Sequence, residues 1–167
     1  MALPAKILVL SDTHFARKSQ RLSSEITKYF DEVDYIIHSG DFTSTGVLEQ
    51  LQDTGKFVGV YGNMDPQEIR DDLPEINEIE LDDLRIGIIH GWGAPDGIIE
   101  RIHGLCKDHG YHVVVVGHTH NHFEQRHDGI WYYNAGSPVD KMFARENTIL
   151  LLTINSKEDI KSNFIKL

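Results

Sequence analysis

Cysteine is nearly absent from this chain of 167 residues, and no apolar run approaches the roughly 20 residues that a membrane-spanning helix needs. The one cysteine, Cys106, excludes a disulfide within the chain and fits a reducing compartment. The first residues, Met1–Lys6, lead straight into an apolar segment and do not resemble a signal peptide. We therefore expect a cytoplasmic protein without a membrane segment, in which Cys106 is a small buried side chain.

Positive charge is scarce as well. The chain has 16 lysines and arginines and 26 aspartates and glutamates, which gives a formal net charge of −10. Such a chain has no basic patch from which counterions would be released, so broad nucleic-acid binding is excluded. Bound divalent cations would offset part of this charge locally and would make a positive site on an acidic surface.

The chain also lacks internal repeats, low-complexity tracts and linker-like stretches. Its length and its content of 40% hydrophobic and 25% charged residues are typical of one soluble globular domain. We predict a single domain over residues 1–167.

What the chain does contain is a series of short apolar runs that each end in a polar turn. Runs of this kind, rich in β-branched residues and bounded by Gly or Asp, are typical of buried strands that end in functional loops. The runs are Ile7–Leu10, Tyr35–Ile37, Phe57–Tyr61, Ile86–Ile89 and Val113–Val116. The turns after them read Asp12-Thr13-His14, Gly40-Asp41, Gly62-Asn63, His90-Gly91 and Gly117-His118-Thr119-His120.

The order of strands and helices predicts the fold class. In the first half, helices near Ser19–Phe30 and Thr45–Gln52 separate strands, which favours a parallel sheet; a loop with Pro66 and Pro74 follows. A helix over Asp96–Lys107 makes another crossover. The later strands are Ile76–Leu81, Arg85–Ile89, Tyr111–Val116, His122–His127, Ile130–Asn134, Thr148–Asn155 and Ile160–Leu167, with hairpin turns at Asp82-Asp83 and Asp128-Gly129. We predict an α/β protein with two packed mixed β-sheets flanked by helices.

The side chains in the five turns are those that bind divalent transition metals. Layered α/β folds place their sites at successive strand ends, so we expect these ligands to converge. Four imidazoles, two carboxylates and one amide, with no thiolate, favour Mn, Fe, Zn, Ni or Co over Ca or Mg. Seven ligands are too many for one ion, which predicts a two-metal centre. The ligands are Asp12, His14, Asp41, Asn63, His90, His118 and His120.

A two-metal centre predicts the reaction. One carboxylate, such as Asp41 after Gly40, can bridge two ions about 3.5–4 Å apart. Two ions lower the pKa of a shared water and hold both non-bridging oxygens of a phosphoryl group, so that a metal-bridging hydroxide attacks phosphorus in line with the leaving oxygen. We predict hydrolysis of a small phosphate ester, with catalytic roles for Asp41, Asn63 and His90.

Each of these residues alone has a simpler explanation. A strand-end aspartate such as Asp12 is more often a cap, and a histidine such as His90 is more often hydrogen-bonded in the core. Asn63 after a glycine is by itself a turn residue, and only the His118-x-His120 pair is balanced between the two readings. The metal centre is favoured because all seven residues follow strands in one chain.

The order D-x-H, G-D, G-N, H-G and G-H-x-H, from Asp12 to His120, resembles the calcineurin-like metallophosphoesterase superfamily. The short length and the G-H-T-H ending are similar to its small YfcE-type phosphodiesterases, and so is the tail with Asn134–Ser137. The resemblance implies a β-sandwich with flanking helices, two divalent ions with manganese as the first expectation, and possible self-association. It assigns Asp12, His14, Asp41 and His120 to the first metal, and Asp41, Asn63, His90 and His118 to the second, with Asp41 as the bridge.

One position departs from the family pattern. Many phosphatases of the superfamily have His directly after the G-N asparagine, and many small phosphodiesterases have Cys, whereas this chain has Met64. A thioether cannot protonate a leaving group, and losing such an acid costs about 10²–10⁴ in rate for a poor leaving group. We therefore expect a diesterase or a hydrolase of activated esters. Asp65 is expected to orient a histidine ligand, and His122, the nearest spare histidine, is better explained as a residue of a surface strand.

Two other functions remain open. A phosphomonoesterase acting on a small phosphate or nucleotide is the alternative among enzymes, and Met64 weighs against it. The same fold also serves as a protein-binding scaffold in the retromer coat, where residues needed for catalysis have been lost. Here every metal-binding position keeps a competent ligand, which favours an enzyme.

Three further features have two explanations each. His38 is expected to be a buried, hydrogen-bonded residue rather than a substrate contact. Trp92 either walls the pocket or packs in a loop. Asn134–Ser137 is expected to be a plain turn, with a place in the pocket wall as the alternative.

Overall fold

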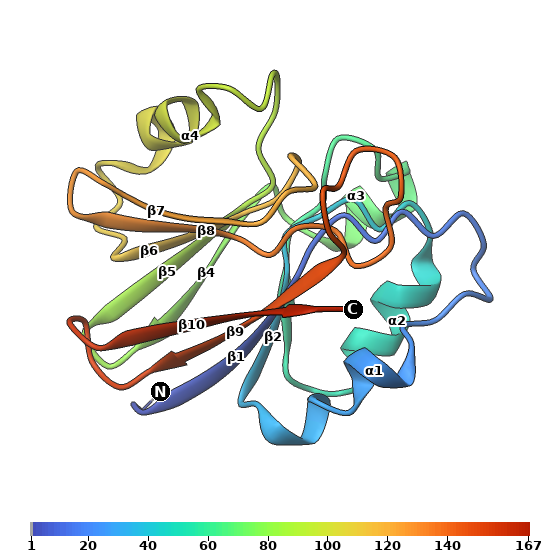
Figure 1. Cartoon of the computed structure of the whole chain (residues 1–167), viewed down its shortest axis with the longest axis horizontal. Helices are drawn as coiled ribbons and strands as arrows, with labels where there is room; N and C mark the ends of the chain where they lie inside the picture. The colour runs from blue at the N-terminus through green and yellow to red at the C-terminus, as the bar shows by residue number, and fades with distance from the viewer. Residues whose placement is uncertain (1) are drawn as a thin grey trace.

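The computed structural model describes residues 2–167 and consists of two five-stranded β-sheets packed face to face with helices outside them (Figure 1). The strand order is β10-β9-β1-β2-β3 in the first sheet and β4-β5-β6-β8-β7 in the second. Both sheets are mixed, which confirms the predicted fold class.

The first sheet is built on three parallel strands. Strands β1 (Ala5–Leu10), β2 (Tyr35–His38) and β3 (Phe57–Gly59) run side by side in the same direction. Strands β9 (Thr148–Ile154) and β10 (Ile160–Lys166) extend the sheet antiparallel at the edge formed by β1. Parallel strands buried on both faces require continuous apolar runs, which explains the β-branched composition of β1 and β2.

The second sheet combines one parallel trio with two hairpins. Strands β5 (Leu84–Ile89), β6 (Val113–Val116) and β8 (Ile130–Asn134) are parallel. The predicted hairpin turns are both present, because β4 (Ile76–Leu81) pairs antiparallel with β5, and β7 (Phe123–His127) pairs antiparallel with β8.

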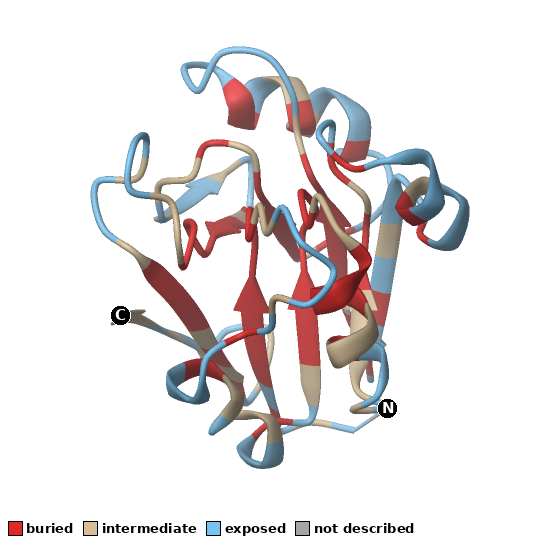
Figure 2. Ribbon diagram, turned by 90° about the vertical axis from the view of Figure 1, so that its right-hand side faces the viewer, coloured by how far each residue is buried: buried red, intermediate tan, exposed pale blue. Residues whose placement is uncertain are grey.

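Apolar residues form three layers of core. One lies between the sheets and includes Ile7, Ile37 and Val115. A second lies under α1 (Ser24–Thr27), α2 (Thr45–Gln52) and α3 (Gln67–Asp72) on the outer face of the first sheet. The third lies under α4 (Ile98–Cys106), which contributes the buried Cys106, on the outer face of the second sheet. Figure 2 shows the buried strands inside and the exposed connections outside. Within residues 2–167, no helix is long and apolar enough to cross a bilayer.

The helix predicted over Ser19–Phe30 is wrong in length. The structure has only the one-turn helix α1 and a 3-10 turn, η1 (Phe30–Glu32). The backbone N–H of Leu22 donates to the Gln50 side chain (2.8 Å) instead of to a helical carbonyl, and the extended Ser23 directly precedes α1. Two apolar residues of the segment, Leu22 and Ile26, are nevertheless buried in the core under the helices.

The loop predicted around Pro66 and Pro74 contains a helix instead. Helix α3 is six residues long, and only Ile69 on it is buried. Its acidic sequence offers a single apolar residue and therefore no helical periodicity. The helix lies directly after the Gly62-Asn63 turn and joins the first sheet to the second.

Candidate metal centre

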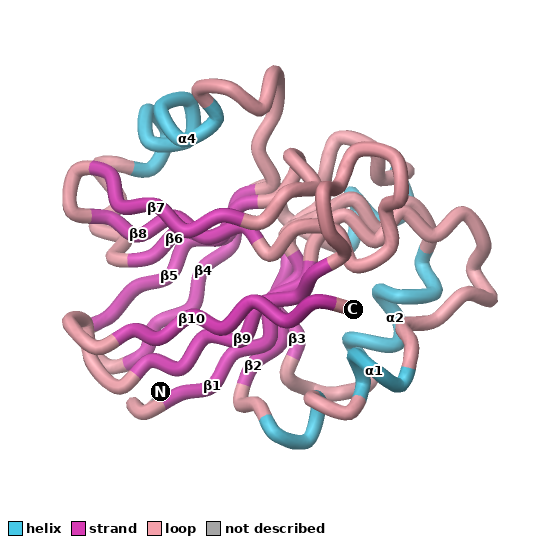
Figure 3. The backbone as a smooth tube through the Cα atoms, viewed as in Figure 1, coloured by secondary structure: helices cyan, strands magenta, loops and turns pink. Residues whose placement is uncertain are grey.

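The five motif turns meet at one end of the two sheets. Figure 3 shows the loops gathered there, at the carboxyl ends of the parallel strands. The register brings these ends level, because Leu10 on β1 pairs with His38 on β2, and Ile89 on β5 pairs with Val116 on β6. Strand pairing within each sheet thus places residues far apart in the sequence around one centre.

Glycines allow these turns to come close together. A Cβ atom on Gly62 would lie 2.1 Å from Oδ1 of Asp41, a distance that real side chains do not tolerate. A Cβ on Gly40 would lie 2.7 Å from the backbone nitrogen of Gly62, and Gly40 also has a φ of +97°. The motif glycines are therefore required by close packing between turns.

The backbone is strained at the centre itself. Non-glycine residues with positive φ cost of order 1–3 kcal/mol each and cluster at functional sites. Five of the seven predicted ligands adopt this conformation: Asp12 (52°), His14 (44°), Asp41 (61°), His118 (72°) and His120 (58°). The side chains at these strained positions converge on the centre.

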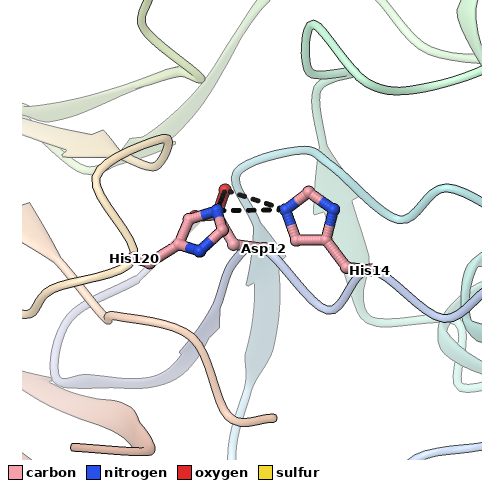
Figure 4. A group of neighbouring side chains, drawn as sticks. All are labelled: Asp12, His14 and His120. Atoms are coloured by element: carbon pink, nitrogen blue, oxygen red, sulfur yellow. Dashed lines mark hydrogen bonds and ion pairs between the residues drawn. The ribbon is translucent and has the colours of Figure 1, made fainter. Parts of the chain in front are cut away.

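The first half of the centre contains Asp12, His14 and His120 (Figure 4). Oδ1 of Asp12 lies 3.4 Å from Nε2 of His120 and 3.8 Å from Nε2 of His14. The two Nε2 atoms are 3.1 Å apart. Three ligand atoms from two distant segments thus face one another.

The second half contains Asn63, His90 and His118. Oδ1 of Asn63 lies 3.1 Å from Nε2 of His90 and 3.0 Å from Nδ1 of His118. These residues follow β3, β5 and β6, so both sheets contribute to this half.

Asp41 lies between the two halves. Its Oδ2 is 3.5 Å from Nε2 of His14 in the first half and 3.3 Å from Nε2 of His90 in the second. Its Oδ1 accepts the backbone N–H of Met64 (2.7 Å), which fixes the carboxylate in this orientation. Asp41 therefore contacts both halves of the centre.

Three histidines are oriented through the nitrogen that faces away from the centre. Nδ1 of His90 donates to the Ser39 carbonyl (2.6 Å), and Nε2 of His118 donates to the Gly93 carbonyl (2.8 Å). Nδ1 of His120 donates to Asp140 (2.5 Å). In each neutral ring the other nitrogen is then a bare acceptor that faces the centre.

A cation fits this cluster of acceptors. Oδ1 of Asp12 is buried and has no hydrogen-bond partner, while its Oδ2 accepts from the Ser11 hydroxyl (2.5 Å) and the His118 backbone N–H (3.0 Å). Ligands of one transition-metal ion, with bonds of about 2.0–2.2 Å, lie about 3.0–3.5 Å apart. Most of the distances between facing atoms are of this size, so the donor set suits divalent metal ions.

The charges of the centre shift the pKa values of its residues. The contact with the Asp12 carboxylate and, against burial, the hydrogen bond with Asp140 raise the pKa of His120 to about 9. Burial alone would lower the pKa of His90, but the carboxylates of Asp41 and Asp12 outweigh it and raise the pKa. Burial opposes ionisation of Asp12, yet its contacts with His120 and His14 hold the pKa of its carboxyl well below the usual range. The carboxylates of the centre thus favour positive charge beside them.

Asp65 does not orient a histidine, contrary to expectation. Its carboxylate accepts the backbone N–H groups of Asp41 (2.9 Å), Gly62 (2.8 Å) and Thr43 (2.8 Å). It therefore joins the turn after β2 to the turn after β3. A short carboxylate beside backbone amides satisfies donors that the tight turns leave free.

Three residues that support the centre were not assigned this role from the sequence. Asp140 orients His120, and the Ser137 hydroxyl donates to the Asp12 carbonyl (2.7 Å). Nδ2 of Asn134 donates to the Gly117 carbonyl (2.7 Å) at the start of the last motif. Asn134–Ser137 is thus more than a plain turn, and the only sequence signal for it was its position after a strand.

The remaining candidates lie beside the centre or away from it. His38 is fully buried, accepts the Gly40 backbone N–H (3.2 Å) and stacks on Phe42, as expected of a core histidine. His122 packs on Phe164, with ring centroids 4.9 Å apart, and precedes β7. Trp92 is 44% exposed and lines a cavity of about 230 Å³ next to His90.

A larger cavity of about 670 Å³ opens directly over the centre. Five predicted ligands form its floor: His14, Asp41, Asn63, His118 and His120. The wall consists of Met64 and the loop Val139, Asp140, Lys141, Met142 and Phe143. Ligand atoms and a binding cavity therefore share one surface.

Comparison with known proteins agrees with this geometry. The family model of the calcineurin-like phosphoesterase superfamily domain matches residues 5–157. A probable metallophosphoesterase of Methanocaldococcus jannaschii is 38% identical over 132 residues, which cover 78% of this chain and 67% of that protein. A phosphodiesterase of the same archaeon is 32% identical over 144 residues, which cover 78% of this chain and 82% of that protein.

The fold is also similar to that of Vps29 proteins. Wild-type Vps29 of Entamoeba histolytica, in a crystal structure with zinc, superposes with a TM-score of 0.69 and 19% identity. The match covers 96% of this chain and 98% of Vps29. At this identity the likeness concerns the fold alone.

Proposed function

The chain belongs to the calcineurin-like phosphoesterase superfamily, and from this membership we propose that it is a two-metal phosphodiesterase that hydrolyses a small phosphate ester. The observation that carries the proposal is the buried, unpartnered Oδ1 of Asp12 among inward-facing imidazole nitrogens. A centre whose inward-facing atoms are all acceptors is stabilised by a bound cation. This centre lies on the floor of a cavity that a substrate can enter.

In this proposal the two halves of the centre hold two divalent transition-metal ions, manganese first among the candidates. Asp12, His14 and His120 hold one ion, Asn63, His90 and His118 hold the other, and Asp41 is shared between them. When bound, two such ions acidify a water molecule and hold the phosphoryl oxygens. The Ser39, Gly93 and Asp140 acceptors keep the ligand histidines in the required tautomer.

Met64 supports a diester as the substrate. Its side chain is 59% exposed and lines the cavity beside Asn63, where a proton donor for the leaving group would stand. A thioether offers no proton, and His122 packs elsewhere, on Phe164. Hydrolysis then depends on a leaving group that departs without strong acid assistance, so a phosphomonoesterase with alkyl substrates is disfavoured.

The experiment uses metal-stripped protein and paired chromogenic substrates. Bis(p-nitrophenyl) phosphate and p-nitrophenyl phosphate are assayed after adding Mn²⁺, Ni²⁺, Zn²⁺ or Mg²⁺. We expect metal-restored activity that favours the diester. Higher activity on the monoester would favour the phosphomonoesterase.

The scaffold alternative requires the same assay rather than metal analysis alone. Vps29 of Entamoeba histolytica is itself complexed with zinc in its structure, so bound metal does not separate a scaffold from an enzyme. Two tightly bound ions without turnover of either ester would count against the phosphodiesterase and favour the scaffold.

A further inference from the structure

The three most exposed large apolar side chains among residues 2–167 stand together above the metal centre. Met142 is 80% exposed, Phe143 68% and Met64 59%. All three line the cavity of about 670 Å³ whose floor is formed by the predicted ligands. Large apolar groups left in water next to a reactive centre indicate a binding surface.

The loop that carries two of these side chains has a defined conformation. The Asp140 carboxylate accepts the backbone N–H groups of Met142 (2.8 Å), Phe143 (3.2 Å) and Ala144 (3.2 Å). Asn147 donates to the Asp140 carbonyl (2.6 Å) and closes the base of the loop. The apolar side chains are thus held in place by backbone hydrogen bonds before any ligand binds.

The same carboxylate connects this loop to the metal centre. Asp140 also accepts the hydrogen bond from His120, and the Phe143 ring lies 6.1 Å from the His120 ring in an edge-on arrangement. A group that lies against Phe143 is therefore next to a metal-facing imidazole. Whatever fills this cavity is within reach of the centre.

The wall has little polar chemistry. Asp140 is fully engaged by backbone amides and His120, and Lys141 is the one lysine or arginine among the described residues that line the cavity. A volume of about 670 Å³ is within the usual range of small-molecule sites. Metal ions, one lysine and an apolar wall suit a phosphate that carries a flat hydrophobic group.

We propose that this cavity binds a flat hydrophobic ester group that stays on phosphorus during hydrolysis, so that the substrates are aryl-type or similarly flat phosphodiesters. The inference rests on the proposed phosphodiesterase function. Departure of the leaving oxygen is faster when a donor protonates it, and Met64, Met142 and Phe143 offer no proton. The group that lies against these side chains is therefore the ester group that stays on phosphorus.

The test compares two diesters with the same leaving group. Phenyl p-nitrophenyl phosphate and ethyl p-nitrophenyl phosphate both release p-nitrophenol and differ only in the group that stays. Burial of a phenyl ring instead of an ethyl group predicts a KM about tenfold lower for the phenyl ester. Equal KM values in the wild-type protein would overturn the proposal, because the nitrophenyl group would then occupy the cavity in both cases.

Variants locate the effect. Phe143→Ala and Met142→Ala should each reduce the phenyl-to-ethyl preference several-fold. Leu105→Ala removes another exposed apolar side chain, on α4 and outside the cavity lining, and should leave the preference unchanged. A preference that survives the double variant at residues 142 and 143 would refute this binding site.

A binding measurement separates this inference from the proposed function. Phenyl methylphosphonate and ethyl methylphosphonate carry a methyl group in place of the leaving group, and their dissociation constants can be measured on the metal-loaded protein. Tighter binding of the phenyl compound, lost in Phe143→Ala, would support the cavity even if no diester were hydrolysed. Equal binding of the two phosphonates would overturn the proposed binding site.

The oligomeric state gives a further outcome. A wild-type dimer that becomes monomeric in Phe143→Ala, without any substrate preference, would show instead that these side chains form an interface between copies.

Discussion

Asp140 accepts a hydrogen bond from Nδ1 of His120 at 2.5 Å, and this contact joins the apolar loop to the metal centre. The same carboxylate accepts three backbone N–H groups of its own loop. His120 therefore presents Nε2 toward Asp12 only while the loop keeps its conformation. The orientation of a predicted metal ligand and the shape of the adjacent cavity depend on one side chain.

Replacement of Asp140 should weaken metal binding without removing a ligand. In Asp140→Asn the acceptor loses its charge, and residues that orient metal-binding histidines change affinity about 10–100-fold. We expect this loss for the first half of the centre in a metal titration. Asp108→Asn, an exposed carboxylate beyond α4, is the control and should bind metal as the wild type does. Identical affinities in the two variants would show that Asp140 does not support His120.

Metal binding should release a proton at neutral pH. Contacts with Asp12 and Asp140 raise the pKa of His120 to about 9, so the ring is protonated at pH 7.5 when no metal is bound. A metal ligand must be neutral, and metal affinity should therefore rise with pH up to about 9 and fall toward pH 5. Calorimetry in buffers of different ionisation enthalpy measures the number of protons released. In His120→Gln this number should fall by about one; an unchanged number would exclude His120 as the source.

Asp41→Asn should remove most of the turnover. The carboxylate oxygen that lies between His14 and His90 becomes part of a neutral amide, which is a poor ligand for two cations at once. We expect a loss of at least about a hundredfold in kcat, together with a lower metal content by elemental analysis. Near-normal rate and metal load in this variant would show that Asp41 is not shared between the ions.

Two glycine-to-alanine variants should have opposite effects. A Cβ on Gly62 would overlap Oδ1 of Asp41, so Gly62→Ala should displace the carboxylate, weaken metal binding and lower the melting temperature. Gly104 lies inside α4 with open space around its Cα, and Gly104→Ala should stabilise the protein by about 0.5–1 kcal/mol. Thermal unfolding measures both. If Gly62→Ala were as stable as Gly104→Ala, the turns after β2 and β3 would be able to move apart and accommodate the added methyl group.

The sequence was sufficient for most of the fold because its strands are short β-branched runs with clear ends. Strands such as β6, four consecutive valines, have no plausible helical reading at that length. The segment Ser19–Phe30 was harder, since its apolar spacing fits a helix while the backbone N–H of Leu22 donates to the side chain of the distant Gln50. Helix α3 could not be found from periodicity, because Ile69 is its only buried residue.

The residues that converge at the candidate metal centre could be predicted from the sequence because each follows a strand in a recognisable motif. The residues that support them could not, since their roles depend on contacts between distant segments. Ser137 reaches Asp12 across 125 positions, and Asp65 was expected beside a histidine but satisfies backbone amides of two turns. Such contacts depend on the packing of the two sheets and have no local pattern.

Met64→His should broaden the leaving groups that the protein accepts. The backbone N–H of Met64 already donates to Asp41, and that bond survives the substitution. The side chain is 59% exposed in the cavity, so an imidazole fits there without disturbing the core. A histidine at this position can protonate a leaving oxygen, and such acid catalysis contributes about 10²–10⁴ in rate when the leaving group is poor.

The measurement is the ratio of kcat for an ester that releases phenol to kcat for the matching ester that releases p-nitrophenol. In Met64→His we expect this ratio to rise and to decline above about pH 6.5, where an ordinary histidine loses its proton. Met64→Gln is the matched control, because glutamine is polar and of similar size but does not act as an acid at these pH values. The same rise in Met64→Gln would trace the effect to cavity polarity. A ratio that stays constant in both variants would mean that proton donation does not limit hydrolysis at this centre, and Met64 would then be explained by its contact with the bound ester group alone.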